Sequence, residues 1–496
     1  MPAFASKACP TLDGADIAVE ICPMSQISSV IPVRFFLNGQ MREATVSPMR
    51  TVLEWLRENA RLSGTKEGCA EGDCGACSIL VGEVVDETVR YHAANSCILT
   101  MGQIDGRVLL TVEGLGGTHP VQTAMAANGS SQCGFCTPGI VMSLVGLADR
   151  RINPDESAIH DALAGNLCRC TGYRPIVEAG MKSAAAGVAA PRPDTLALTG
   201  LRAASLVRSE GTEFHQPSSL AELLALRTAR PGAVLLAGGT DLGVSIADYH
   251  GDWSEVISTA RVAELRAIEE TDDSIRFGAA ATWEEVLERV AGLYPSLAIL
   301  IRRFGSTQIR SMGTIGGNIG TASPIGDGPP ALIALGARIA LVSPRGTREM
   351  PLEDFFLGYR KTELKSDEVI GSVSLPKPVN GQEFRVYKVS KRYDQDISTV
   401  CGAFSVVMRD RIVSEARIAF GGMAATPKRC GPAEAAIIGT PLDEAAVRAA
   451  SEAIASHFQP LSDWRGGAAY RSRVAANLAD RFRRDIAGET VEVMAL

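Results

Sequence analysis

Four cysteines constrain this chain more than any other feature of its sequence. Three of them lie in the glycine-rich segment 68–78, and the fourth lies farther along the chain: Cys69, Cys74, Cys77 and Cys97. The spacing Cys-x4-Cys-x2-Cys with a distant fourth cysteine is the plant-type ligand pattern for a 2Fe-2S cluster. A loop so rich in glycine is unsuited to helix or strand. We therefore predict that it wraps one such cluster.

The glycines of this loop have a physical role. Gly68, Gly72 and Gly75 let backbone amides approach bridging sulfides and allow positive φ between the ligands. The alternatives are a disulfide knot or buried small residues, and a zinc site. Structural zinc usually takes two Cys-x2-Cys-like pairs, which a four-residue gap does not provide. The spacing favours iron and sulfide.

A second group of four cysteines lies in segment 113–186, where the hydrophobic period becomes helical: Cys133, Cys136, Cys168 and Cys170. Thr137-Pro138 is typical of a helix start, and we expect Thr171 to cap another helix. Helix N-termini favour a negatively charged cluster. Zinc is the alternative, disfavoured because one residue separates the members of the second pair. We predict a second 2Fe-2S cluster here.

Bulk properties indicate a multidomain globular protein of 496 residues, with 46% hydrophobic and 21% charged residues. A net charge of −7 argues against a nucleic-acid surface. The other four cysteines (Cys9, Cys22, Cys401 and Cys430) are scattered, so cysteine usage favours cofactor ligation in a reducing compartment. Segment 1–30 lacks the apolar block of a signal peptide, and no later apolar run is long enough to cross a membrane. We expect a cytoplasmic protein.

Hydrophobic periodicity predicts a multidomain α+β chain. Alternating apolar residues in 33–37 precede the hairpin turn Asn38-Gly39, and a helix follows Thr51. We expect six segments: an N-terminal tail 1–30, a β-grasp ferredoxin domain 31–112, a helical 2Fe-2S domain 113–186, a linker 187–213, a third domain 214–383 and a C-terminal α/β domain 384–496.

Two glycine-rich loops mark the third domain. Segment 237–243 follows a predicted strand, and segment 313–324 reads Gly-Thr-Ile-Gly-Gly-Asn-Ile-Gly-Thr-Ala-Ser-Pro. Neither is a Rossmann or a Walker loop, but together they can hold a pyrophosphate through backbone amides; the alternative is two tight turns. Phe304 is either a flavin-stacking or a core residue, and Tyr359 lies in a dinucleotide contact or a solvated turn.

The C-terminal segment offers little chemistry. We expect strands at 399–408 and 416–420, a helix starting at Thr440-Pro441, and a second helix whose apolar stripe is Val474, Leu478 and Phe482. No Ser-His-Asp, His-Glu-x-x-His or paired-carboxylate pattern is visible in the sequence.

The order of these motifs resembles that in the small subunits of bacterial xanthine dehydrogenases, within the molybdenum hydroxylase family. The resemblance rests on the ferredoxin loop, Cys-Gly-Phe-Cys-Thr-Pro-Gly, Asn-Leu-Cys-Arg-Cys-Thr-Gly-Tyr, Ala-Gly-Gly-Thr-Asp-Leu and Thr-Ile-Gly-Gly-Asn-Ile-Gly-Thr-Ala-Ser-Pro-Ile-Gly-Asp, and it runs from about Ile31 to the C-terminus. It implies an FAD domain like that of vanillyl-alcohol oxidase.

The resemblance also implies site residues. The FAD contacts would be Leu236, Gly238, Gly239, Thr240, Asp241, Phe304, Thr314, Gly317, Asn318, Thr321, Ser323, Asp327, Lys388 and Asp396. Tyr359 would face NAD. Two departures from the family pattern are Gly467, where a serine is usual, and Gln395, in a loop that is more acidic in some relatives. The first departure affects a local helix cap, and the second affects the choice between NAD and oxygen.

The resemblance further implies a partner. A large subunit would carry the molybdopterin and the substrate pocket, NAD would accept the electrons, and two small and two large subunits would form a heterotetramer. No residue of substrate hydroxylation is expected on this chain. Aldehyde or carbon monoxide dehydrogenase types are the alternative substrate classes, and a zinc and disulfide interaction module is the non-catalytic alternative.

Overall fold

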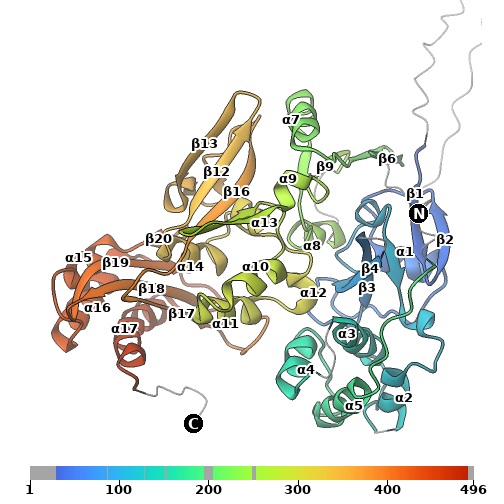
Figure 1. Ribbon diagram of the computed structural model, residues 1–496, viewed down its shortest axis with the longest axis horizontal. Coiled ribbons are helices and arrows are strands. Elements are labelled where there is room, and N and C mark those ends of the chain that lie inside the picture. The colour runs from blue at the N-terminus through green and yellow to red at the C-terminus, as the bar shows by residue number, and fades with distance from the viewer. Residues whose placement is uncertain are drawn as a thin grey trace, which may run out of the picture.

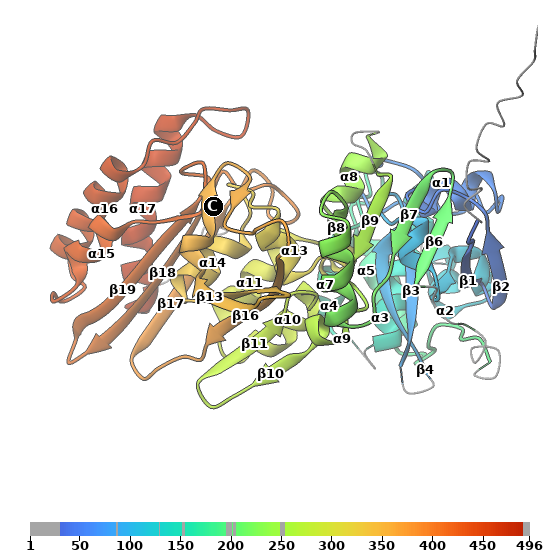
Figure 2. The same cartoon turned by 90° about the horizontal axis from the view of Figure 1, so that it is seen from above.

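The computed structural model is elongated and contains four domains (Figures 1 and 2). The ferredoxin-like and helical domains form one end, the C-terminal domain forms the other, and the central domain lies between them. The predicted tail lies outside the described residues, except for Val30. The structure describes residues 30–85, 88–127, 129–150, 154–194, 201, 205–248 and 253–489.

The ferredoxin-like domain is a five-stranded sheet of order β2-β1-β5-β3-β4 with one helix packed against it. Asn38 and Gly39 take φ of +50° and +80°, as a type I′ turn requires. Thr51 caps the helix by accepting a hydrogen bond from the Glu54 amide. The expected β-grasp is confirmed. Its elements are β1 (Val33–Leu37), β2 (Gln40–Ala44), α1 (Val52–Glu58), β3 (Ser78–Val85), β4 (Thr88–Asn95) and β5 (Val108–Leu110).

Four helices form the next domain, as expected: α2 (Pro120–Ala127), α3 (Thr137–Arg150), α4 (Glu156–Leu163) and α5 (Arg174–Ala184). The expected cap at Thr171 was wrong, because α5 begins at Arg174 after Tyr173. The Thr171 hydroxyl instead contacts the Cys168 thiol at 3.1 Å. Thr137 is already helical, and its hydroxyl contacts that of Ser131.

The central domain begins earlier than predicted. Strand β6 lies inside the expected linker and pairs with β7, so the linker prediction was wrong over those residues. The first sheet has the order β6-β7-β9-β8, and β7 and β8 both run parallel to β9. Its elements are β6 (Leu206–Ser209), β7 (Thr212–His215), α7 (Leu220–Ala229), β8 (Val234–Leu236), α8 (Leu242–Ala247) and β9 (Glu255–Ser258).

A second sheet of order β10-β11-β16-β12-β13 completes the central domain. Helices α10 and α11 cover it and contribute Trp283, Val286, Leu297 and Ile301 to its core. The elements are α9 (Ala263–Arg266), β10 (Ile268–Glu270), β11 (Ser274–Gly278), α10 (Trp283–Val290), α11 (Pro295–Phe304), α12 (Thr307–Arg310), α13 (Ile315–Gly320), α14 (Gly328–Ala334), β12 (Arg338–Ser343), β13 (Gly346–Pro351), β14 (Phe356–Gly358), β15 (Lys361–Thr362) and β16 (Val369–Pro376).

The C-terminal domain is an antiparallel sheet, β17-β18-β19-β20, covered by three helices (Figure 2). The helix expected at Thr440-Pro441 starts later, because Asp443 caps it. Leu478 and Phe482 are buried and Val474 packs against them, which confirms the predicted stripe. The elements are β17 (Gln382–Val389), β18 (Val400–Arg409), β19 (Ile412–Gly421), β20 (Lys428–Arg429), α15 (Gly431–Ile437), α16 (Glu444–His457) and α17 (Ala468–Ile486).

The departure at Gly467 has the expected local effect. Gly467 is the N-cap of α17 and offers no side-chain cap.

Within the described ranges, no helix is both long and apolar enough to span a bilayer.

Charged side chains join the ferredoxin-like domain to the central domain. The Glu83 carboxylate accepts hydrogen bonds from Arg107 of its own domain and from Arg266 of the central domain, the latter at 3.0 Å. Burial opposes ionisation of Glu83, but the two guanidinium groups outweigh burial and lower its pKa to about 2. His92 lies beside them, and burial, reinforced by Arg107, lowers its pKa to about 4.

This arrangement predicts that the folded protein loses stability at acidic pH because of His92. An unfolded histidine titrates near ~6.5, so below that pH the unfolded chain binds a proton that folded His92 refuses until about pH 4. The stabilisation is therefore full above pH ~6.5 and falls by about 1.4 kcal/mol per pH unit toward pH 4. Thermal unfolding between pH 8 and 5 should show a shallower pH dependence in His92→Gln than in the unmodified chain.

The control is His160→Gln, since His160 is exposed on α4 and its substitution should leave the pH dependence unchanged. An unaltered slope in His92→Gln would contradict the assignment.

Candidate functional site

The first cysteine site comprises Cys69, Cys74, Cys77 and Cys97, and it brings the four thiols of the predicted plant-type pattern close together. The Cys77 and Cys97 sulfurs lie 3.3 Å apart, and the Cys69 sulfur accepts hydrogen bonds from the Cys74 amide at 3.3 Å and the Glu71 amide at 3.4 Å. The Cys74 thiol, followed by that of Cys97, lowers the pKa of Cys69. Backbone amides and thiols thus stabilise negative charge on sulfur, the form that binds iron.

The loop around this site depends on glycine in two ways. Gly72 and Gly75 have φ of +81° and +67°, as predicted. Gly68 does not: a Cβ there would lie 2.7 Å from the Cys74 sulfur, so its role is to leave space. Ala70 also takes positive φ, at +60°, which the sequence did not indicate.

The second cysteine site comprises Cys133, Cys136, Cys168 and Cys170. Its thiols pair across two segments, since Cys133 contacts Cys170 and Cys136 contacts Cys168. Cys133 and Cys170 are exposed, whereas Cys136 and Cys168 are half-buried. Burial, together with the Cys168 thiol, raises the pKa of Cys136 to about 12. Across the described part of the chain, no group of three or more Cys, His, Asp or Glu side chains has the geometry of a single-ion site. Ligation by these eight cysteines stays a prediction.

The two cysteine sites are directly joined by hydrogen bonds. The Leu167 amide, next to Cys168, donates to the Cys74 carbonyl at 2.9 Å, and the Asn166 side-chain amide donates to the Gly75 carbonyl at 3.0 Å. A Cβ on Gly139 of α3 would lie 2.1 Å from that same Gly75 carbonyl. The helical domain therefore packs on the first cysteine loop with no space between them.

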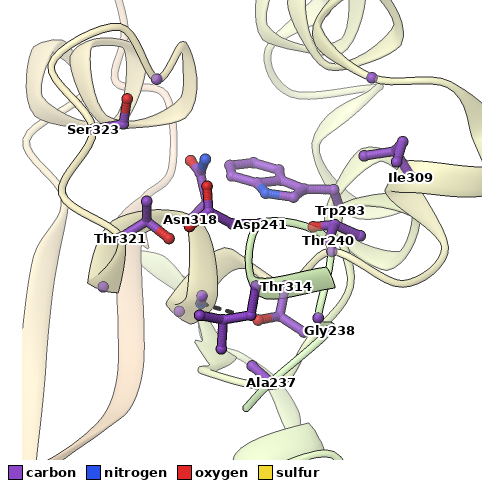
Figure 3. A pocket seen from close by; sticks show the side chains of 18 of the residues that line it. Ala237, Gly238, Thr240, Asp241, Trp283, Ile309, Thr314, Asn318, Thr321 and Ser323 are labelled. Carbon is purple, nitrogen blue, oxygen red and sulfur yellow. Dashed lines mark hydrogen bonds between the residues drawn. The ribbon is translucent and has the colours of Figure 1, made fainter. Parts of the chain in front are cut away.

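A cavity of about 840 Å³ opens in the central domain, and we call it the central cavity. Both predicted glycine-rich loops line it: the segment that joins β8 to α8, and the segment that contains α13 (Figure 3). Glu71, Gly72 and Asp73 of the first cysteine loop also line it. Its size is within the range of cofactor sites.

Glycine sets the shape of the cavity floor. A Cβ on Gly238 would lie 1.8 Å from the Met312 carbonyl oxygen, so the two glycine-rich loops touch through their backbones. A Cβ on Gly316 would lie 2.5 Å from the Cβ of Ala279. Thr314 caps α13 by accepting a hydrogen bond from the Gly317 amide at 3.0 Å. The two loops therefore meet through backbone and small side chains, which lets a ligand approach this part of the cavity closely.

Two buried polar atoms at the cavity lack a hydrogen-bond partner in the described part of the protein. Among the described residues, Asn318 Oδ1 and Trp283 Nε1 have no hydrogen-bond partner, and both side chains line the cavity (Figure 3). Buried polar atoms are rarely left unpaired, because desolvation without a partner costs about 1–3 kcal/mol. A large ligand with both acceptors and donors satisfies this site, and FAD fits that description.

Most of the predicted FAD contacts line the central cavity: Gly238, Gly239, Thr240, Asp241, Phe304, Thr314, Gly317, Asn318, Thr321, Ser323, Asp327 and Asp396. Leu236 does not, because it is fully buried in the core beneath the loop. Tyr359 is exposed and also lies outside the lining, although its neighbour Arg360 contributes to it and pairs with Asp241 at 3.9 Å.

Lys388 also lies outside the lining and acts on the cavity through Asp327. Its ammonium group donates to Asp327 at 2.6 Å and to Ser398 at 2.9 Å, and all three side chains are buried. Ser398 donates in turn to the other Asp327 oxygen at 2.5 Å. The Asp327 carboxylate is thus held in one orientation at the cavity wall.

Trp283 is the site residue that sequence reasoning missed. Thr282 and Glu285 form a capping box at the start of α10, and the Trp283 amide donates to the Gly313 carbonyl at 2.9 Å. The Trp283 ring meets that of Phe304 edge-on, at 4.9 Å between centroids. A tryptophan on the apolar side of an amphipathic helix is normally interpreted as a core residue. No local sequence signal shows that Trp283 faces a cavity.

Four family descriptions match the chain in order. They are a 2Fe-2S iron-sulfur cluster binding domain (35–101), a [2Fe-2S] binding domain (111–181), an FAD binding domain in molybdopterin dehydrogenase (209–378) and a CO dehydrogenase flavoprotein C-terminal domain (385–486). With the geometry above, they define an iron–sulfur flavoprotein with two 2Fe-2S domains and one FAD-binding domain.

Known relatives narrow this class. Xanthine dehydrogenase/oxidase of Gallus gallus is 33% identical over 79% of this chain and 35% of its own length, and xanthine dehydrogenase 1 of Arabidopsis thaliana is 34% identical over 75% and 33%. The chain spans about a third of the length of these relatives. Carbon monoxide dehydrogenase from Hydrogenophaga pseudoflava has a chain that is 32% identical, with a TM-score of 0.53, covering 54% of this chain and 95% of its own. This protein belongs to the molybdenum hydroxylase family, as an iron–sulfur and flavin portion.

Proposed function

We propose that this chain is the electron-transfer subunit of a xanthine dehydrogenase. Electrons from a molybdenum centre on a large partner subunit pass through the second cysteine site, then the first cysteine site and the flavin, to NAD+. Each turnover oxidises hypoxanthine to xanthine, or xanthine to urate, with one water and one NAD+, giving one NADH and one proton. Two small and two large subunits form the proposed assembly.

The observation that carries the proposal is the order of the three sites. The first cysteine loop contacts the second site on one side, through the Leu167 amide, and lines the central cavity on the other, through Gly72. Gly243 of α8 packs so closely on the Ile98 carbonyl, next to Cys97, that a Cβ would lie 2.2 Å from it. A chain of short contacts therefore supports transfer in this sequence.

The residues of the chain position and insulate the carriers. A bound flavin accepts single electrons from iron–sulfur clusters and passes a hydride to a nicotinamide. Asn318, Trp283 and the amides of the glycine-rich loops would hold it, while buried Lys388 fixes the Asp327 carboxylate beside it. Exposed Tyr359 and neighbouring Arg360 at the cavity support an NAD contact there.

A second candidate keeps the cofactors and changes the substrate. Residues 385–486 match a CO dehydrogenase flavoprotein C-terminal domain, and a chain of a solved carbon monoxide dehydrogenase resembles 54% of this one. An aldehyde or carbon monoxide dehydrogenase type is therefore the alternative. The xanthine type is favoured because xanthine dehydrogenases match 75–79% of this chain, whereas that carbon monoxide dehydrogenase chain matches 54%. Assaying the purified complex with xanthine, aldehydes and carbon monoxide decides between them, and the large chain that co-purifies identifies the partner.

Cys136→Ser tests the electron path. Cys136 belongs to the second site and lies outside the central cavity lining, so the variant should keep its FAD and the first cluster. We expect NADH formation driven by xanthine to fall below about 1% of the unmodified rate, because the path is broken at its entry. Stopped-flow absorbance at 340 nm measures it.

The matched control is Cys430→Ser, the same change at a cysteine buried in the C-terminal core. Its turnover should be largely unchanged. Full turnover in Cys136→Ser would overturn the assigned path.

A further inference from the structure

A buried polar node joins three domains midway between the two cysteine sites. The Gln308 side-chain amide nitrogen, on α12 of the central domain, lies 3.1 Å from Ser78 Oγ, 2.9 Å from Ser143 Oγ and 3.0 Å from Asn166 Oδ1. Ser78 starts β3 of the ferredoxin-like domain, and Ser143 lies on α3 of the helical domain. Each of the four side chains is at most 3% exposed.

The hydrogen-bond donors and acceptors of this node are complementary, with Gln308 as the donor to the two serine hydroxyls. The Ser78 hydroxyl donates to the Gly75 carbonyl at 2.8 Å, and the Ser143 hydroxyl donates to Asn166 Oδ1 at 2.7 Å. Both hydroxyl oxygens are therefore left as acceptors. With Asn166 Oδ1 they present three acceptors to the two N–H protons of Gln308, so the nitrogen end of the amide is held toward the node.

Packing holds Gln308 there as well. Gly165 lies so close that a Cβ on it would be 2.3 Å from Gln308 Oε1 and 2.5 Å from the Cβ of Ser306. No larger residue fits at position 165 without displacing the Gln308 amide.

The node touches the segments that carry the ligands of both cysteine sites. Ser78 follows Cys77, and Asn166 precedes Cys168 by two residues and donates to the Gly75 carbonyl inside the first loop. The residue after Gln308, Ile309, packs against the buried cluster that contains Cys77 and Cys97, and it also lines the central cavity (Figure 3). One short helix of the central domain is thus anchored to both cysteine sites and to the cavity wall.

We propose that Gln308 is a positioning residue for electron transfer, which fixes the distance between the two iron–sulfur clusters and from the first cluster to the flavin. The inference rests on the proposed electron path but not on its substrate. Electron transfer between fixed centres depends on their separation and orientation, so a residue remote from the chemistry that holds both centres in place affects the rate.

The test uses Gln308→Leu in the purified complex, with a similar volume and no amide. Two measurements need neither substrate nor NAD+: the magnetic splitting between the two clusters in the EPR spectrum of dithionite-reduced protein, and the rate of flavin reduction by the clusters after a laser-injected electron. We expect a weakened splitting and a roughly tenfold or larger fall in rate, with the iron content, the flavin content and the thermal midpoint near those of the unmodified complex.

Gln382→Leu is the matched control, because it removes the same kind of bond, from Gln382 to the Ser405 hydroxyl at 2.9 Å, in the C-terminal sheet. Both readouts should be unchanged there. An unaltered splitting and rate in Gln308→Leu would overturn the proposal even if xanthine turnover proves the electron path.

Ser143→Ala keeps the proposal testable if Gln308→Leu loses iron. It removes one acceptor of the Gln308 amide and should weaken the splitting in the same direction, and in an intact double variant it should add nothing to Gln308→Leu. A Ser143→Ala complex with the splitting and rate of the unmodified protein, or effects that add in full, would reject the node. If the unmodified complex shows no xanthine turnover while both readouts change in the variants as expected, the proposed substrate is rejected and the node is not.

Discussion

Gly238→Ala is expected to weaken FAD binding strongly while leaving both iron–sulfur clusters in place. The new methyl group would lie 1.8 Å from the Met312 carbonyl oxygen, 2.5 Å from its carbon and 2.9 Å from the Gly313 Cα. All three are backbone atoms, so the two glycine-rich loops must separate. Overpacking of this kind costs up to about 3 kcal/mol, which is roughly a hundredfold in affinity if it falls on the bound form.

The measurement is the ratio of flavin absorbance to iron content in the purified chain, followed by a titration with FAD. Gly292→Ala is the control, since no atom lies within 4 Å of a Cβ at that position in the same domain. A Gly238→Ala protein that retains stoichiometric flavin would show that the two loops are not in contact when the cofactor binds.

Arg310→Met is expected to release the helical domain from the central domain. The Arg310 guanidinium group is fully buried and donates to Glu284 at 2.8 Å, to both Asp161 oxygens at 3.1 and 3.2 Å and to the Gly305 carbonyl at 2.8 Å. Asp161 lies on α4 and Glu284 on α10, so this one side chain connects the two domains. Removing it leaves Asp161 without this cation and Glu284 with the more distant Arg150, at 3.6 Å. Breaking such a pair costs about 3–5 kcal/mol when it is fully buried.

Because Asp161 and Glu284 are about a quarter exposed, we expect the lower end of that range. Hydrogen exchange should accelerate over α4 and α12 and leave the C-terminal sheet unaffected. Arg345→Met removes an exposed pair with Asp367 and is the control, with an effect of at most about 1 kcal/mol. Equal effects of the two variants would show that Arg310 holds no interface.

The sequence predicted the parts of this molecule that local chemistry determines. The cysteine spacings, the hairpin at Asn38-Gly39 and the two glycine-rich loops each require particular residue types within a few positions, so their patterns were readable. The order of domains followed from these patterns and from the family resemblance, and twelve of the fourteen residues predicted to contact FAD line the central cavity.

The features that the sequence did not predict depend on contacts between residues that are distant along the chain. Trp283 and Gln308 acquire their roles from partners in other elements or domains, and an isolated tryptophan or glutamine carries no local sign of this. Leu236 and Lys388 lie behind the cavity wall, where a motif cannot separate a lining residue from the residue that supports it. The Thr171 cap failed because α5 begins at Arg174, so the amide that donates to the Thr171 hydroxyl, that of Tyr173, lies just before the helix.

The enclosure of the first cysteine loop has a consequence for how the protein matures. Cys77 and Cys97 are 2% exposed, and the helical and central domains both close over the loop that surrounds them. We therefore expect iron to reach the first cysteine site before these domains dock, whereas exposed Cys133 and Cys170 stay accessible afterwards. The expected order of biogenesis is the interior metal first and the peripheral one last.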